Sequence, residues 1–318
     1  MNVPAPQSWW RLGLALLAFV LWAHPSLVGL PFAALLLLLP SAQRPRWAQP
    51  LAGLIGAMSV SLLVLTAQQG ARLAAVTSAY VVIVTAAFVG LILMKPGAPP
   101  ILQQTLRALL IGMLATGALI QLFWGSEAWG ALAWEATREA GVTMRSIVEV
   151  APDTFMIYEP MVRFVSLTWP GMLALQTLAG LALAWHLYRR VAFARAVVPA
   201  TSFKDFRMGD GWVWGIVAWL GVLILPVSSA LHVAGTNLGL IASVLYALRG
   251  AAIVVTFAEA FGVSVVALVI MAGLAAALAV PLLFVLPGLC TLGITDTWYQ
   301  YRRRLAAARS AGTTQSKD

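Results

Sequence analysis

The chain has 318 residues, of which 61% are hydrophobic and 10% are charged, and its formal net charge is +9. Soluble globular proteins are about 45–50% apolar and about 25% charged, so this composition excludes a soluble fold as well as a disordered or collagen-like chain. The sequence therefore predicts an all-α polytopic membrane protein, a bundle of transmembrane helices.

The first apolar stretch, 12–40, is too long for a single crossing. At about 1.5 Å per residue it would form a helix of roughly 43 Å, whereas the bilayer core is about 30 Å thick. It contains Pro25, Pro31 and Pro40, and proline bends or ends a helix because it lacks a backbone donor. We expect a hairpin of two short helices here, with a single crossing as the alternative.

Six further stretches are long and apolar enough to cross once. They are 50–66, 73–94, 100–123, 164–187, 211–231 and 236–257. The largest segment expected outside the membrane is 124–163. Within it Trp129, Leu132, Ala133 and Ala136 follow one another at helical spacing, which predicts an amphipathic helix on the membrane surface.

The last apolar stretch, 262–295, would form a helix of roughly 51 Å. It contains Pro281 and Pro287, so a second hairpin of two short helices is expected. Residues 296–304 follow it with three aromatic side chains and three arginines. This composition predicts the start of an interfacial helix, with its aromatic rings at headgroup level.

The basic residues set the expected orientation. The N-terminus and the loops assigned to the cytoplasm hold 14 of the 20 Lys and Arg residues, and the outside segments hold four. Because cytoplasmic loops carry the excess of Lys and Arg, both termini are expected in the cytoplasm. We expect ten crossings, or nine if 12–40 crosses once. They form one transmembrane domain, 1–309, followed by a disordered tail, 310–318.

No motif in the sequence names a reaction. A phosphate loop, His-Glu-x-x-His, Cys-x-x-Cys and Gly-x-Ser-x-Gly are all absent, and no span carries paired carboxylates at catalytic spacing. We expect no enzymatic activity, no metal site and no cofactor. The positive charge indicates basic loops beside anionic lipid, and not a nucleic-acid partner, because no polar domain interleaves basic with stacking aromatic residues.

Arg249 is the clearest polar residue inside an apolar span. Its guanidinium cannot lose its charge, and an unpaired arginine at the centre of a span costs about 2.5–3.5 kcal/mol. Asn237 lies twelve residues earlier, about 18 Å along the same helix. Arg249 and Asn237 are therefore candidate ligand-binding residues that would line a cavity. The alternative is that Arg249 serves structural pairing or reaches the membrane surface.

A set of charged residues falls on the expected cytoplasmic face, namely Asp205, Arg207, Asp210, Asp296 and Arg302. Asp205 and Asp210 flank the start of one helix, where carboxylates favour the positive end of the helix dipole. Asp296 is expected to pair with Arg207 or Arg249. The set predicts either a charge network that fixes the cytoplasmic ends of three helices or a docking site for a cytoplasmic partner.

Three segments of the C-terminal half share a pattern with known proteins. FKDFR at 203–207, TNL and LYALRG within 236–250, and LGITD followed by two arginines within 292–303 resemble the YybS-like family of bacterial polytopic membrane proteins. GLPF at 29–32 and WPG at 169–171 are similar to earlier family patterns. The resemblance implies a multi-pass protein of the bacterial cytoplasmic (inner) membrane. At the level of fold it also implies a likeness to the substrate-binding subunits of vitamin transporters.

The expected function is a small-molecule binding or transport-related subunit. The alternative is a non-transporting membrane scaffold or assembly factor that acts through its basic cytoplasmic loops. The expected partners are the lipid bilayer and, according to which function holds, a small-molecule ligand or a cytoplasmic protein. A polar cavity around Arg249 would favour the first function, and an Arg–Asp pair sealed by packing would favour the second.

Overall fold

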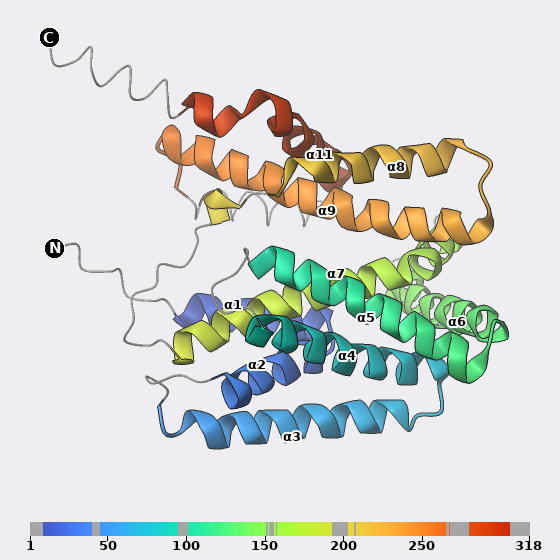
Figure 1. Cartoon of the computed structure of the whole chain (residues 1–318). Coiled ribbons are helices and arrows are strands. Elements are labelled where there is room, and N and C mark those ends of the chain that lie inside the picture. The colour runs from blue at the N-terminus through green and yellow to red at the C-terminus, as the bar shows by residue number, and fades with distance from the viewer. Residues whose placement is uncertain are drawn as a thin grey trace, which may run out of the picture. The chain divides into compact units, whose positions relative to one another are not determined.

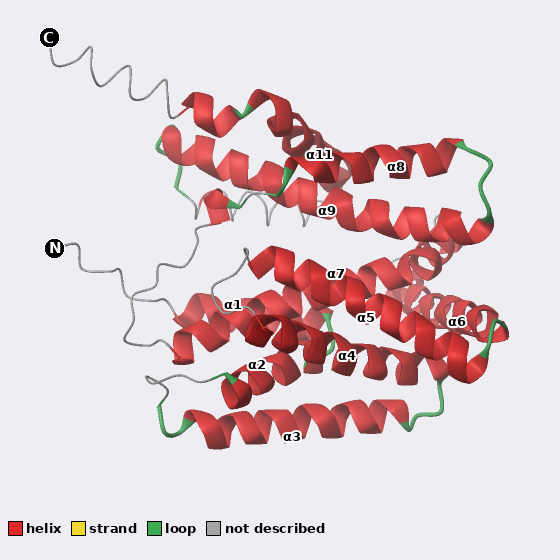
Figure 2. Ribbon diagram, viewed as in Figure 1, coloured by secondary structure: helices red, strands yellow, loops and turns green. Residues whose placement is uncertain are grey.

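The all-α prediction is confirmed in the part of the chain that the structure describes. The computed structural model describes residues 9–39, 45–94, 101–150, 152, 156, 158–192, 203–206, 208–264, 267 and 280–305. These residues form α-helices and short 3-10 turns and contain no strand (Figure 2). Contacts between residues divide the chain into two compact units, Met1–Val198 and Pro199–Asp318.

Five of the described helices are long and apolar enough to cross a membrane. They are α3 (Ala48–Ala67), α4 (Arg72–Met94), α5 (Ile101–Trp124), α7 (Tyr158–Ala192) and α9 (Ser229–Ala260). This composition is that of a membrane protein. The expected total of ten crossings, the orientation of the termini and the bacterial inner membrane stay predictions.

The stretch 12–40 contains two short helices, α1 (Trp9–Trp22) and α2 (Ser26–Leu38). Pro25 stands immediately before α2, where a missing backbone donor costs nothing, and Pro31 lies inside α2 without ending it. His24 lies in the turn between the two helices, where it borders a cavity of the first unit.

The short helix α2 forms the centre of the first unit. It packs against α3, α4 and α7 (Figure 1), and eight of its 13 side chains are buried. A helix surrounded in this way must be apolar all round, and the sequence of α2 is. By contrast α3, at the edge of the unit, buries only Ala48, Ala52, Ser59 and Leu63. Its remaining apolar surface is free to face lipid.

The segment 124–163, expected outside the membrane, contains α6 (Glu127–Val150), which packs against α4, α5 and α7. Its buried side chains recur every fourth residue: Ala128, Leu132, Ala136, Ala140 and Met144. The expected apolar face contained Leu132 and Ala136, but Trp129 and Ala133 are exposed. The buried stripe is therefore rotated from the expected one, because it covers the ends of neighbouring helices and not only a lipid surface.

The second unit contains two 3-10 turns, η2 (Phe203–Asp205) and η3 (Asp210–Trp212), followed by α8 (Val213–Ile224), α9 and α11 (Val280–Tyr299). The expected span over 211–231 is not one continuous helix. α8 ends at Ile224, and Leu225 is extended just before Pro226. Proline disfavours the helical conformation in the residue before it, so the chain breaks here and α9 begins at Ser229.

α9 is the axis of the second unit, with α8 and α11 packed against it (Figure 1). α11 continues through Pro287 to Tyr299. Much of the first part of the expected hairpin 262–295, residues 265–266 and 268–279, lies outside the described residues, as does the tail 310–318.

Two glycines allow α9 and α11 to approach closely. A Cβ on Gly250 would meet the Leu289 carbonyl, and a Cβ on Gly293 would meet the Tyr246 carbonyl. Small residues let helix backbones pack at short range in a membrane, so this contact sets the position of Arg249 against the end of α11.

Candidate functional site

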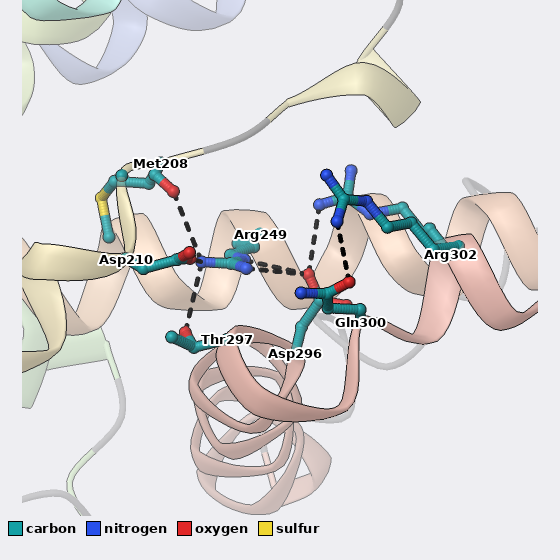
Figure 3. Close-up of a pocket in the computed structure, with 9 residues that line it drawn as sticks. Met208, Asp210, Arg249, Asp296, Thr297, Gln300 and Arg302 are labelled. Carbon is teal, nitrogen blue, oxygen red and sulfur yellow. Dashed lines mark hydrogen bonds and ion pairs between the residues drawn. The ribbon is translucent and has the colours of Figure 1, made fainter.

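A buried ion pair joins the two closely packed helices of the second unit. Arg249 on α9 donates through Nε to Asp296 Oδ2 on α11 at 3.1 Å, and its Nη2 lies 3.0 Å from the same oxygen. The two side chains are only 6% and 5% exposed. A charge buried to this degree needs a partner of opposite charge, and Arg249 and Asp296 are such partners for each other. Figure 3 shows Arg249 lying between Asp296 and Asp210.

The second oxygen of Asp296 shapes the chain at the end of α11. Asp296 Oδ1 accepts a hydrogen bond from the backbone N–H of Tyr301 at 3.0 Å. Gln300, between them, adopts a positive φ of 48°. This left-handed backbone conformation cannot continue a right-handed helix, so α11 ends here. A new helical turn starts at Tyr301, so the interfacial helix expected over 296–304 is interrupted at Gln300.

The break at Gln300 brings Arg302 back to the same carboxylate. Arg302 Nη2 lies 3.3 Å from Asp296 Oδ2, while its Nη1 donates to the carbonyl oxygens of Lys204 at 2.7 Å and Phe206 at 3.0 Å. One carboxylate therefore serves two guanidinium groups. Arg302 also ties the turn η2 to the end of α11.

The remaining donors of Arg249 have weaker partners. Its Nη1 lies 3.5 Å from Asp210 Oδ1 and 3.5 Å from the Met208 carbonyl, and it donates to Thr297 Oγ1 at 3.3 Å. The Asp210 side chain is 69% exposed, so water screens its attraction to Arg249. This side of the guanidinium keeps capacity for a stronger acceptor.

A cavity of about 170 Å³ opens beside these groups, and we call it the arginine cavity. Its lining consists of Met208, Gly209, Asp210, Arg249, Asp296, Thr297, Gln300, Arg302 and Arg303. Three arginines against two aspartates give this lining a net charge of +1. The cavity therefore presents a surplus of hydrogen-bond donors and positive charge.

The structure brings together four of the residues singled out from the sequence: Asp210, Arg249, Asp296 and Arg302. Asn237 does not line the cavity. Its side-chain amide donates to the Val233 carbonyl, one turn earlier on α9, at 2.8 Å. Asp205 lies in η2, with a side chain outside the described residues, and Arg207 lies outside them altogether.

Sequence reasoning missed three groups that shape this site. Thr297, Gln300 and Arg303 line the cavity. Residues three or four positions apart share one side of a helix, so their spacing beside Asp296 was the signal that could have found them. The left-handed Gln300 redirects the chain after α11, and Arg302 then reaches the same carboxylate. Glutamine carries no strong preference for this conformation, so the sequence contained no local signal for the break.

Comparison of the chain with protein-family models, with curated proteins and with solved structures finds no match. The resemblance to the YybS-like family accordingly stays a prediction.

Proposed function

We propose that this chain is a membrane-embedded binding protein, a small-molecule binding or transport-related subunit, and that the arginine cavity receives the anionic group of its ligand. The observation that carries the proposal is the lining itself, in which Arg249, Arg302 and Arg303 surround a cavity with a surplus of positive charge. Planar guanidinium groups with fixed positions suit carboxylates and phosphates, because they offer paired parallel donors.

The pairing with Asp296 supports a binding role because it orients the donors in advance. Arg249 is held through Nε and Nη2 and presents Nη1 to weaker partners. Arg302 is held by two backbone carbonyls. Binding then costs little side-chain entropy, since the groups that receive the ligand are already ordered. The same pairing removes part of the positive charge, so we expect moderate affinity and not a tight anion trap.

Titration calorimetry of the purified full chain in a non-ionic detergent tests the proposal. The probes are inorganic phosphate and succinate, at low salt because screening weakens such binding. Both Arg303 and Arg304 are exposed, but only Arg303 lines the cavity. Arg303→Gln should weaken binding several-fold and Arg304→Gln should leave it unchanged. Absence of saturable binding by either anion, or equal behaviour of the two variants, would overturn the proposal.

Uptake separates binding from transport. In proteoliposomes loaded with buffer, a transport-related subunit that works alone should accumulate the anion that binds best, and Arg303→Gln should reduce the initial rate. A binding subunit that needs a partner would bind the anion without uptake. In the bacterial inner membrane, with both termini in the cytoplasm as we propose, the arginine cavity would face the cytoplasm.

A scaffold or assembly factor is the second candidate, and one observation favours it. Arg249 and Arg302 contact the carbonyl oxygens of Met208, Lys204 and Phe206, so the cluster also holds the segment before α8 in place. Such a rigid basic surface could dock a cytoplasmic protein. A variant with both Arg303→Gln and Arg304→Gln should then lose a co-purifying protein. Retained co-purification together with lost phosphate or succinate binding would favour the first candidate.

A further inference from the structure

The first unit contains a second polar cavity, of about 270 Å³, between the turn after α1 and the adjoining ends of α3 and α4. Its lining consists of His24, Leu63, Thr66, Gln69, Leu73, Ala74, Thr77, Ser78, Val81, Glu139 and Trp169. We call it the acceptor cavity, because its polar groups differ in kind from those of the arginine cavity.

Each hydroxyl group of the acceptor cavity donates its hydrogen to a backbone carbonyl. Thr77 donates to the Leu73 carbonyl at 2.8 Å. Ser78 donates to the Leu63 carbonyl at 3.2 Å. Thr66 likewise donates to the carbonyl one turn before it. A hydroxyl has a single hydrogen, so these three oxygens can offer a ligand only their lone pairs.

Glu139 and His24 add two further acceptors to the lining, and Gln69 adds an amide that can both accept and donate. Glu139 is exposed, and no described residue forms a hydrogen bond or an ion pair with its carboxylate. His24 Nδ1 is buried and has no hydrogen-bond partner among the described residues. Burial lowers the pKa of this imidazole, so the ring is neutral at pH 7 and Nδ1 can accept when the proton sits on Nε2.

The charge of the lining selects a cation. Glu139 carries the single full charge among the residues that border the cavity. Trp169 adds an aromatic ring, and aromatic faces attract cations. No group of three His, Cys, Asp or Glu side chains that could hold a metal ion occurs in the described part of the chain. The cation is therefore better sought among organic ammonium groups than among transition metals.

We propose that the acceptor cavity binds a primary ammonium group carried on a small apolar body. A primary ammonium has three N–H donors, which suit a wall of hydroxyl, carboxylate and imidazole acceptors. Leu63, Leu73, Ala74 and Val81 supply apolar surface for the rest of the ligand. The ammonium belongs either to a soluble amine or to the headgroup of phosphatidylethanolamine, which present the same chemistry to the cavity.

Calorimetric titration of the full chain with butylammonium, in a non-ionic detergent, tests the proposal. We expect saturable binding, with butanol and butanoate at least tenfold weaker because they lack the charge or reverse it. Butyltrimethylammonium keeps the charge but has no N–H donor, so it should also bind more weakly. Absence of saturable butylammonium binding, or equal binding of butanol, would overturn the proposal.

Two variants assign the binding to this cavity. Glu139→Gln should weaken butylammonium at least fivefold, whereas Glu149→Gln, an exposed acid of the same helix that does not border the cavity, should have no effect. Thr77→Val keeps the side-chain shape and removes one acceptor, so it should also weaken binding. Both acidic positions are exposed, so folding is expected to survive. Equal affinities of Glu139→Gln and Glu149→Gln would contradict the assignment.

Nanodiscs distinguish the two sources of the ammonium group. If the headgroup is the natural occupant, discs that contain phosphatidylethanolamine should weaken butylammonium binding relative to discs of pure phosphatidylcholine, and Glu139→Gln should abolish that difference. If the occupant is a soluble amine, the two kinds of disc should give the same affinity. Either result supports an ammonium site, and loss of all saturable binding in both discs would overturn it.

Discussion

The two units treat their polar residues in opposite ways. In the second unit the buried charges satisfy one another, since Asp296 receives both Arg249 and Arg302 on a single oxygen. In the first unit α2 and its neighbours pack through apolar side chains, and the acid that borders the cavity, Glu139, has no partner among the described residues. The second unit thus uses its ion cluster to hold segments together, and the first leaves the Glu139 carboxylate available.

This difference shows why the number of polar contacts is a poor guide to stability. Substitution of a carboxylate that pairs with two buried cations costs much stability, because the cations stay buried without a counter-ion. Substitution of an exposed carboxylate costs little stability, because water solvates its former partner. Four variants, taken from the largest expected effect to the smallest, break or sharpen the contrast.

Asp296→Ala should have the largest effect. It leaves two nearly buried guanidinium groups without a counter-ion and removes the acceptor for the Tyr301 amide. Removal of one partner from a buried ion pair typically costs about 3–5 kcal/mol. The midpoint of unfolding by sodium dodecyl sulfate, followed by circular dichroism in mixed micelles, measures this loss. Glu259→Gln removes an exposed acid that pairs with Lys204, and a shift no larger than that of this variant would show that the cluster does not stabilise the second unit.

Gly293→Ala should come next. Its new Cβ would meet the Tyr246 carbonyl oxygen and lie 2.9 Å from the carbonyl carbon, so α11 must move away from α9. Overpacking of this kind costs about 1–3 kcal/mol. Gly288→Ala in the same helix is the matched control, because a Cβ there meets nothing within 4 Å. Equal unfolding midpoints for the two variants would mean that α9 and α11 are not held at this distance.

Glu135→Ala probes a carboxylate of the first unit that does have a structural role. Glu135 Oε2 accepts from the backbone N–H of Leu73 at 2.7 Å, at the start of α4. Loss of a side chain that caps a helix start costs about 0.5–2 kcal/mol. Glu149→Ala, in the same helix and exposed, should be neutral. The unfolding midpoints of the two variants give the comparison, and a neutral Glu135→Ala would remove the capping role.

Glu259→Gln should have the smallest effect. Its ion pair with Lys204 has an N–O distance of 3.1 Å, similar to that of Arg249 with Asp296, but its side chains are 43% and 39% exposed. Exposed pairs contribute about 0–1 kcal/mol. Unfolding in the presence of added salt should therefore show almost no difference from the unmodified chain. A loss comparable with that of Asp296→Ala would contradict the role given to burial.

The sequence predicted the helices best where apolar length alone decides. The bounds of α3, α4 and α5 lie close to the expected spans, because a run of about 20 apolar residues leaves few alternatives. The expected span over 211–231 is divided into the end of α8 and the start of α9, because Pro226 breaks the helix despite the continuous hydropathy around it. The rotation of α6 depended on which neighbours it covers, and periodicity in one helix does not contain that information.

The candidate site was partly accessible for a physical reason. An arginine in an apolar span needs an acceptor, and this requirement left Asp205, Asp210 and Asp296 as the candidate partners of Arg249. The approach of Arg302 to Asp296 depends on the left-handed break at Gln300, and no residue type at that position predicts the break. The acceptor cavity was not foreseen, because its groups come from the turn after α1 and from α3, α4, α6 and α7. Only tertiary packing brings these elements together.

The charge of the arginine cavity offers the most direct test, through a variant that should bind better. Asp210 borders the cavity, is 69% exposed and lies 3.5 Å from Arg249, where it competes with an incoming anion. Asp210→Asn should tighten phosphate or succinate binding by about fivefold, the effect of one unit charge at about 4 Å in a water-like medium. Glu259→Gln, which removes an exposed acid away from the cavity, should leave the affinity unchanged. Unchanged or weaker anion binding in Asp210→Asn would contradict a ligand site at Arg249.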